Sequence, residues 1–118
     1  MTLSLYAYPN CNSCKKAEKW LNSHNLTYNY IHIVEDTPTD EELLNMIKKS
    51  ELPGKKFFNT SGKVYRERNL KNVVKDATIE EMAKLLASDG MLIKRPIITD
   101  SKNVTVGFNE QTLEETWL

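Results

Sequence analysis

The two cysteines of the chain stand close together, where a helix is expected to begin. Cys11 and Cys14 are separated by two residues, and both follow an apolar stretch that alternates as a strand does. Cysteine pairs at this spacing bind metals, form structural disulfides or exchange electrons. The spacing alone leaves these three uses open.

A metal site and a structural disulfide both fit the sequence poorly. A structural zinc ion takes about four ligands, and the only other soft ligands are His24 and His32, whose spacing fits none of the usual motifs. A disulfide that closes so short a loop constrains the unfolded chain little. We therefore expect no bound metal or prosthetic group, and we interpret Cys11 and Cys14 as a redox-active pair that forms a reversible disulfide.

The helix expected after the pair would make one of the two thiols reactive. A thiolate, not a thiol, attacks a disulfide. Cys11 stands at the start of the helix, where free backbone N–H groups and the helix dipole favour negative charge, and Lys15 and Lys16 add cations within a turn. We expect Cys11 to be the nucleophile and Cys14, one turn further in, to be the resolving thiol. The alternative is a pair of cysteines without function at a helix start.

The composition is typical of a small globular protein. The chain has 118 residues, 40% hydrophobic and 27% charged, which is enough for one compact domain. Sixteen basic residues balance sixteen acidic ones, so we expect no direct binding of nucleic acid. No apolar run reaches the length of a membrane span, and the first residues lack the pattern of a secretory signal. We therefore expect a cytoplasmic protein with no membrane partner.

The two ends of the chain carry a strand and helix pattern that predicts an α/β sheet. A strand, a helix and a second strand in succession imply a parallel strand pair with a right-handed crossover. Near the C-terminus, two short apolar strands separated by a polar turn predict a hairpin, followed by one more helix. The expected elements are strands over residues 3–8, 27–34, 97–99 and 104–106, and helices over 13–23 and after the N-cap Asn109.

The middle of the chain, about residues 36–88, has a helical pattern instead. Two capping boxes, Thr39–Glu42 and Thr78–Glu81, each predict the start of a helix. Gly90 is well suited to end the second of these helices. We interpret this block as an insertion within a single domain that covers residues 1–118.

A second informative stretch precedes the hairpin. Pro96 is either a strand-edge residue of no functional interest or a cis proline that lies against the cysteines and leaves a backbone edge open for a substrate chain. The sequence leaves the isomer open. Arg95 beside it would offer a cation to a thiolate or to an anionic substrate. The alternative for Arg95 is a solvated surface charge.

Three stretches together resemble the ArsC/Spx family: Tyr8–Ala17 followed by Trp20–Leu21, then Leu92–Ile97, then Val106–Glu110. The resemblance covers essentially the full chain. It implies a thioredoxin-like fold of the α/β class, with a mixed four-stranded sheet in the order βαβ then ββα and a helical insertion. It also implies that Pro96 is a cis proline and that Arg95 lies beside the cysteine loop.

The resemblance implies a thiol–disulfide oxidoreductase that is linked to glutathione or thioredoxin as electron donor. We expect Cys11, Cys14 and Arg95 to be its catalytic residues and a small-molecule or protein disulfide to be its substrate. The residues expected to bind that substrate are Pro96, Asn12, Ser13 and Lys15.

Departures from the family pattern weaken one activity, arsenate reduction. Arsenate reductases of this family use a single catalytic cysteine with several arginines around the oxyanion, and a serine is usual where this chain has Cys14. Arg95 corresponds to one of those arginines. The other two would fall near Phe58–Thr60 and Val106–Phe108, which contain no arginine. Arsenate reduction is therefore the least favoured of the family's activities.

Redox-sensing regulation of transcription is the alternative function. In Spx proteins the cysteine pair is a redox switch, and the protein binds the C-terminal domain of the RNA polymerase α subunit. This chain keeps the pair. Gly54 lies in the region where Spx has a glycine that touches the polymerase, although a glycine after a proline also simply ends a helix.

Overall fold

The computed structural model describes residues 2–118 and divides the chain into two compact units. The sheet unit contains the segment up to His32 and the segment from Arg95 to Leu118, and the helical unit contains Ile33–Lys94. The predicted insertion, about residues 36–88, lies within the helical unit. That the whole chain forms a single domain stays a prediction.

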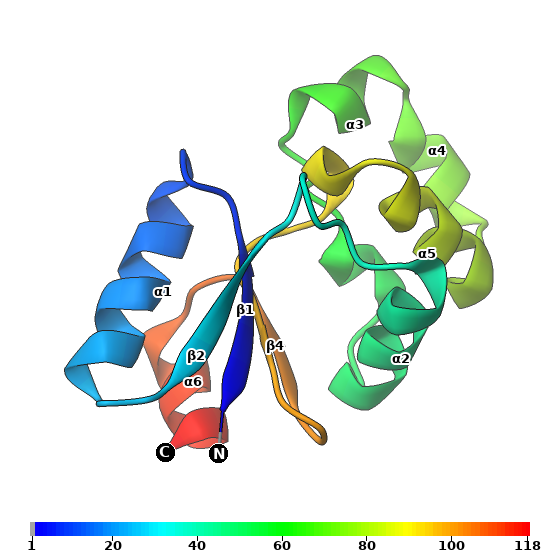
Figure 1. The fold of residues 1–118 in the computed structure, drawn as a ribbon. Coiled ribbons are helices and arrows are strands. Elements are labelled where there is room, and N and C mark those ends of the chain that lie inside the picture. The colour runs from blue at the N-terminus through cyan, green and yellow to red at the C-terminus, as the bar shows by residue number, and fades with distance from the viewer. Residues whose placement is uncertain (1) are drawn as a thin grey trace. The chain divides into compact units, whose positions relative to one another are not determined.

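The sheet unit has the mixed four-stranded sheet that the sequence predicted. Its strands are β1 (Leu3–Ala7), β2 (Tyr28–His32), β3 (Ile97–Thr99) and β4 (Val104–Val106), and they lie in the order β2-β1-β3-β4. The pair β1–β2 is parallel, whereas β1–β3 and β3–β4 are antiparallel. The predicted parallel strand pair and the predicted hairpin are therefore both confirmed (Figure 1).

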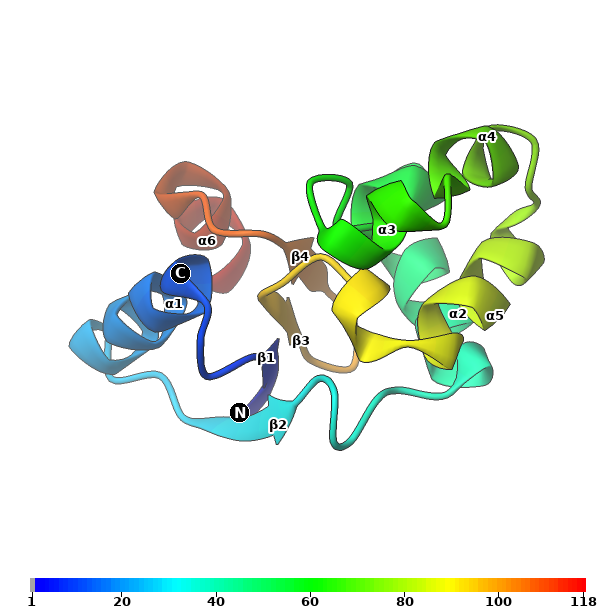
Figure 2. The same ribbon diagram turned by 90° about the horizontal axis from the view of Figure 1, so that it is seen from above.

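Two helices cover one face of this sheet, as Figure 2 shows. Helix α1 (Asn12–Ser23) connects β1 to β2, and α6 (Glu110–Trp117) follows β4. Asn109 caps α6 as predicted, because its side-chain oxygen accepts the Thr112 backbone N–H at 3.1 Å. The side chains buried between the helices and the sheet include Leu5, Ala17, Leu21, Ile98 and Leu113. This packing holds the first turn of α1, which contains Cys14, against the core of the sheet unit.

The helical unit begins its two main helices where the sequence predicted. Both capping boxes are formed: Thr39 and Thr78 each accept a backbone N–H, and Glu42 and Glu81 each accept one in return. Phe57 is fully buried in this unit. The helices are α2 (Asp40–Ser50), α3 (Lys63–Glu67), α4 (Leu70–Lys75) and α5 (Ile79–Ser88), with short 3₁₀ turns η1 (Gly54–Phe57) and η2 (Gly90–Leu92).

Gly90 follows α5 as predicted, but the reason for a glycine there is different. The helix does not end through a left-handed residue at Gly90; among the described glycines the left-handed one is Gly107, with φ 82°. Instead, a Cβ at Gly90 would lie 2.2 Å from the backbone oxygen of Ile33. The close approach of two backbone segments therefore requires glycine at this position.

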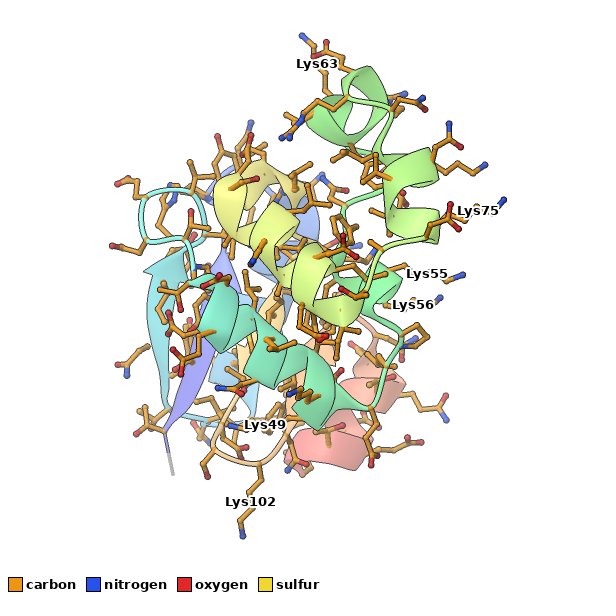
Figure 3. All side chains as sticks on the ribbon, turned by 90° about the vertical axis from the view of Figure 1, so that its right-hand side faces the viewer. Lys49, Lys55, Lys56, Lys63, Lys75 and Lys102 are labelled. Atoms are coloured by element: carbon orange, nitrogen blue, oxygen red, sulfur yellow. The ribbon has the colours of Figure 1, made fainter. Side chains whose placement is uncertain are left out.

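The basic residues in the middle of the chain extend into solvent. Figure 3 labels Lys49, Lys55, Lys56, Lys63 and Lys75, whose side chains point away from the ribbon of the helical unit. Lys63 makes an exposed pair with Glu67 at 3.8 Å, and pairs of this kind add little stability. Within residues 2–118, no helix combines the length and the apolar character needed to cross a bilayer.

Candidate redox site

Cys11 is the N-cap residue of α1, and its sulfur occupies the place of the usual capping oxygen. Its backbone is extended (φ −132°, ψ 115°), and its Sγ accepts the Cys14 backbone N–H at 3.3 Å. The thiol of Cys14 donates a second hydrogen bond to the same Sγ, with 2.6 Å between the sulfurs. Two donors therefore converge on the atom that was predicted to carry negative charge.

The two thiols differ in their access to solvent. Both are free cysteines, but Cys11 is half-buried whereas the side chain of Cys14 lies in the core of the sheet unit and is only 1% exposed. Cys14 packs there with Ala17 and Leu21 of its own helix. A substrate can therefore reach Cys11 first, with Cys14 directly behind it.

Burial gives Cys14 a strong hold on its proton. The pKa of the Cys14 thiol is raised from 9.0 to about 12, first by burial, and then by the hydrogen bond to Cys11 and the negative charge of Cys11. A backbone hydrogen bond with Tyr8 and the positive charge of Arg95 act in the opposite direction. Cys14 is therefore a protonated donor at neutral pH, which suits its hydrogen bond to Cys11.

Arg95 and Pro96 lie at the start of β3, next to the end of β1. The Arg95–Pro96 peptide bond is cis, as the family resemblance implied. Pro96 is buried, and its carbonyl accepts the Gly107 backbone N–H at 2.8 Å. Arg95 is half-buried and close enough to Cys14 for its charge to act on that thiol. Arg95 therefore belongs to the surroundings of the cysteine pair and is not a fully solvated charge.

Tyr8 is a member of this cluster to which sequence reasoning assigned no role. The guanidinium carbon of Arg95 lies over its ring, 5.3 Å from the centroid, which is within the range of a cation–π contact. The ring of His32 meets Tyr8 edge-on, with centroids 5.4 Å apart and an interplanar angle of 77°. The position of Tyr8, between β1 and the cysteine loop, is the signal by which the sequence could have identified it.

Two tyrosines of β2 also face α1. The hydroxyl of Tyr28 donates a 3.0 Å hydrogen bond to Glu18. Tyr30 is 39% exposed, and its pKa lies above the ordinary value: partial burial raises it first, and then the charges of Glu18, Cys14 and Cys11. The side chains that border the cysteine pair therefore come from α1, from β2 and from the segment before β3.

The remaining predicted site residues, Asn12, Ser13 and Lys15, lie in the first turn of α1. All three are exposed. Their predicted role in substrate binding stays a prediction. Among residues 2–118, no cluster of three or more histidine, cysteine or acidic side chains is arranged to hold a metal ion.

Comparisons with known proteins identify the family and the fold of this chain. The model of the ArsC family matches residues 6–116. The uncharacterized protein YusI of Bacillus subtilis is 54% identical over 117 residues, which is 99% of each chain. The global transcriptional regulator Spx 1 of Lactococcus lactis is 35% identical over 111 residues, 94% of this chain and 85% of that one.

A solved structure of an ArsC-related protein from Bacteroides fragilis shares the fold. It superposes with a TM-score of 0.93 at 45% identity, over 98% of this chain and 97% of that one. Together with the mixed sheet, this similarity confirms the predicted thioredoxin-like α/β fold. The family match and the relatives show that this chain belongs to the ArsC family.

Proposed function

We propose that this protein is a thiol–disulfide oxidoreductase that works through Cys11 and Cys14. The observation that carries the proposal is the geometry of the pair: a half-buried sulfur at a helix N-cap accepts a hydrogen bond from a buried thiol 2.6 Å away. Such an arrangement supports a nucleophile and a resolving thiol in contact. Kinship with the ArsC family supports thiol redox chemistry in general.

In the first step the Cys11 thiolate attacks one sulfur of a substrate disulfide. A bond forms between Cys11 Sγ and that sulfur, and the substrate's S–S bond breaks. The second substrate sulfur leaves as a thiolate and takes a proton from solvent. Two donors, the backbone N–H and the thiol of Cys14, support the charge on Cys11 before the attack.

In the second step Cys14 resolves the mixed disulfide. Cys14 loses its proton, its sulfur attacks Cys11 Sγ, and the substrate's remaining sulfur leaves and is protonated. Two electrons have then passed from the pair to the substrate, and Cys11 and Cys14 are joined. Because the pKa of Cys14 is about 12 in the reduced pair, we expect its deprotonation to limit this step.

We propose that glutathione or thioredoxin restores the reduced pair. Two glutathione thiols, or one dithiol, would supply two electrons and be oxidised to a disulfide. Such a cycle suits the cytoplasm, where glutathione and thioredoxin keep thiols reduced. Arg95 would stabilise the thiolates of the cycle, and the substrate would bind along Pro96 and the exposed loop residues, which are Asn12, Ser13 and Lys15.

A turnover assay with two matched variants tests the proposal. The purified protein should reduce a small disulfide when it is coupled to glutathione or thioredoxin. Cys11→Ser should abolish turnover, whereas Cys14→Ser should accumulate a mixed disulfide with the substrate at Cys11, visible by mass spectrometry. Turnover that survives in Cys11→Ser would overturn the proposal.

Redox-sensing regulation of transcription is the second candidate, because Spx 1 of Lactococcus lactis is similar over 94% of this chain. In this proposal, oxidation of Cys11 and Cys14 would alter binding to the C-terminal domain of the RNA polymerase α subunit. One observation weakens the link through Gly54. Gly54 is buried, and a Cβ there would lie 2.5 Å from the Met82 sulfur, so packing within the helical unit accounts for the glycine.

Binding and turnover separate the two candidates. A regulator should bind the isolated polymerase domain, and oxidant should change that binding. Turnover without such binding would exclude the regulator, and binding without turnover would exclude the oxidoreductase. A coupled assay on arsenate should give no NADPH oxidation, since the two stretches expected to supply further arginines contain none.

A further inference from the structure

Tyr8 contacts the surroundings of the cysteine pair at three points. Its backbone takes part in a hydrogen bond with Cys14, its ring carries the Arg95 guanidinium at 5.3 Å, and the ring of His32 meets it edge-on at 5.4 Å. The three partners come from α1, from the segment before β3 and from the end of β2. Tyr8 therefore contacts three segments that lie around the two thiols.

The Arg95 guanidinium must be held in a defined position if its charge is to act on the cysteine pair. An arginine has a long, flexible stem, and its charge acts on a thiol only while the guanidinium stays near it. The negative face of an aromatic ring holds a guanidinium at a defined position, and the contact strengthens when both groups are partly removed from water. Tyr8 and Arg95 are both half-buried. The edge-on contact with His32 in turn restrains the Tyr8 ring.

We propose that Tyr8 is a positioning residue: its ring holds the Arg95 guanidinium beside Cys11 and Cys14, and thereby sets how readily the pair is oxidised. The proposal rests on the proposed function, since it assigns the residue that tunes the same pair. Tyr8 acts through Arg95 and takes no part in bond making.

The direction of the effect follows from the charge of Arg95. A cation near the pair stabilises the thiolate of the reduced form and has no comparable partner in the neutral disulfide. Loss of the Tyr8 ring releases the cation, so the reduced form becomes less stable. The reduction potential of the pair should then fall, and alkylation of Cys11 at a fixed pH should slow down.

Other charged and titratable groups lie around Cys11 and Cys14, and an experiment that compares variants at position 8 must keep these groups constant. These groups are Glu18, Lys15 and Lys16 on α1, Tyr30 and His32 on β2, and Arg95 before β3. All variants are therefore compared at one pH and one ionic strength. Only the ring at position 8 and its cationic partner change.

The experiment compares Tyr8→Leu, which removes the ring, with Tyr8→Phe, which keeps it. Alkylation of Cys11 by iodoacetamide is measured in a Cys14→Ala background, and the reduction potential is measured with the intact pair in glutathione buffers. Tyr8→Leu should slow alkylation about three- to tenfold. It should lower the reduction potential by about 15–30 mV, which corresponds to the same three- to tenfold change in the redox equilibrium constant. Tyr8→Phe should stay within about twofold of the parent protein in both.

A double-mutant cycle shows whether the ring acts through the arginine. In an Arg95→Met background, Tyr8→Leu should change neither alkylation nor potential by more than about twofold. Full persistence of the Tyr8→Leu effect in that background would overturn the proposal, as would equal effects of Tyr8→Leu and Tyr8→Phe. Unchanged alkylation and potential in Tyr8→Leu would also overturn it.

A second series guards against a Tyr8→Leu variant that does not fold. Fluorinated phenylalanines at position 8 keep the shape of the ring while weakening its negative face, so alkylation should slow in order of fluorination. A flat series would refute the ring's role. If the cysteines form no disulfide in glutathione buffers, the proposed function fails, whereas the alkylation rates still decide the role of Tyr8.

Discussion

The thiol of Cys14 donates a hydrogen bond to the Sγ of Cys11 across 2.6 Å, from inside the core to the edge of it. The two sulfurs thus have unequal surroundings although both residues belong to the first turn of one helix. The buried Cys14 sulfur keeps the proton, and the half-buried Cys11 sulfur accepts a hydrogen bond from it. This inequality is what assigns different chemical roles to two residues of the same type.

The proton held by Cys14 should make stability depend on alkaline pH. The folded pKa of about 12 exceeds the ordinary value of 9.0, so between these values the folded state keeps a proton that the unfolded chain has lost. The free energy of unfolding should therefore fall as pH rises above about 9, more steeply in the parent protein than in Cys14→Ala, by up to about 1.4 kcal/mol per pH unit. Urea unfolding between pH 8 and pH 11 checks this, and parallel curves for the two proteins would contradict it.

Replacing Gly90 with alanine should destabilise the helical unit. The new Cβ would lie 2.2 Å from the Ile33 backbone oxygen, so the backbone must move. We expect a loss of at least about 2 kcal/mol in the free energy of unfolding, measured by chemical denaturation. Gly54→Ala is the matched control, because its Cβ would meet the flexible Met82 side chain and should cost less. Equal costs for the two variants would be evidence against this reading of Gly90.

The hydrogen bond between the indole of Trp117 and the hydroxyl of Thr105 should contribute to the stability of the sheet unit. Its Nε1–H donates a 3.1 Å hydrogen bond to Thr105 Oγ1, and Thr105 is only 4% exposed. Thr105→Val removes the acceptor but keeps the shape, so it should cost about 1–2 kcal/mol in thermal or urea unfolding. Thr105→Ser keeps the hydroxyl and should restore the hydrogen bond. A Thr105→Val protein as stable as Thr105→Ser would show that the indole finds another acceptor.

The two capping boxes should contribute comparable amounts to the stability of the helical unit. Thr39 and Thr78 accept backbone N–H groups at the same 3.1 Å, and each has its reciprocal glutamate. Thr39→Ala and Thr78→Ala should each lower the free energy of unfolding by about 1 kcal/mol, whereas Thr→Ser at either position should have little effect. A pair of losses that differ several-fold would mean that one helix start is held mainly by packing.

The features that sequence reasoning predicted correctly are local ones. The helix that begins at the cysteines, the capping boxes and the cap at Asn109 all depend on residues three or four positions apart. Helical geometry alone brings such residues together. The strand pattern of β1 repeats every two residues, and β3 and β4 are joined by a short turn, so both features also depend on residues close together in the sequence.

The role of Gly90 shows where local reasoning fails. Its position after α5 matched a helix end, and the expectation of a helix-ending glycine was correct as to place. The cause is the close approach of the backbone at Ile33, which lies far away in the sequence. No local sequence pattern predicts a contact of that kind, because the contact depends on how segments distant in the sequence pack together.

By itself, the sequence determined that two cysteines would share the first turn of a helix after a strand, since the 3.6-residue period places them side by side. Only the tertiary structure decided which thiol is buried and which residues surround the pair. The antiparallel register of β1 and β3, with Tyr6 opposite Ile97, brings the end of β1 next to the start of β3, and Arg95 thereby meets Tyr8. Pairing between strands so distant in sequence is set by the packing of the whole sheet unit, and the residues near the cysteines do not encode it.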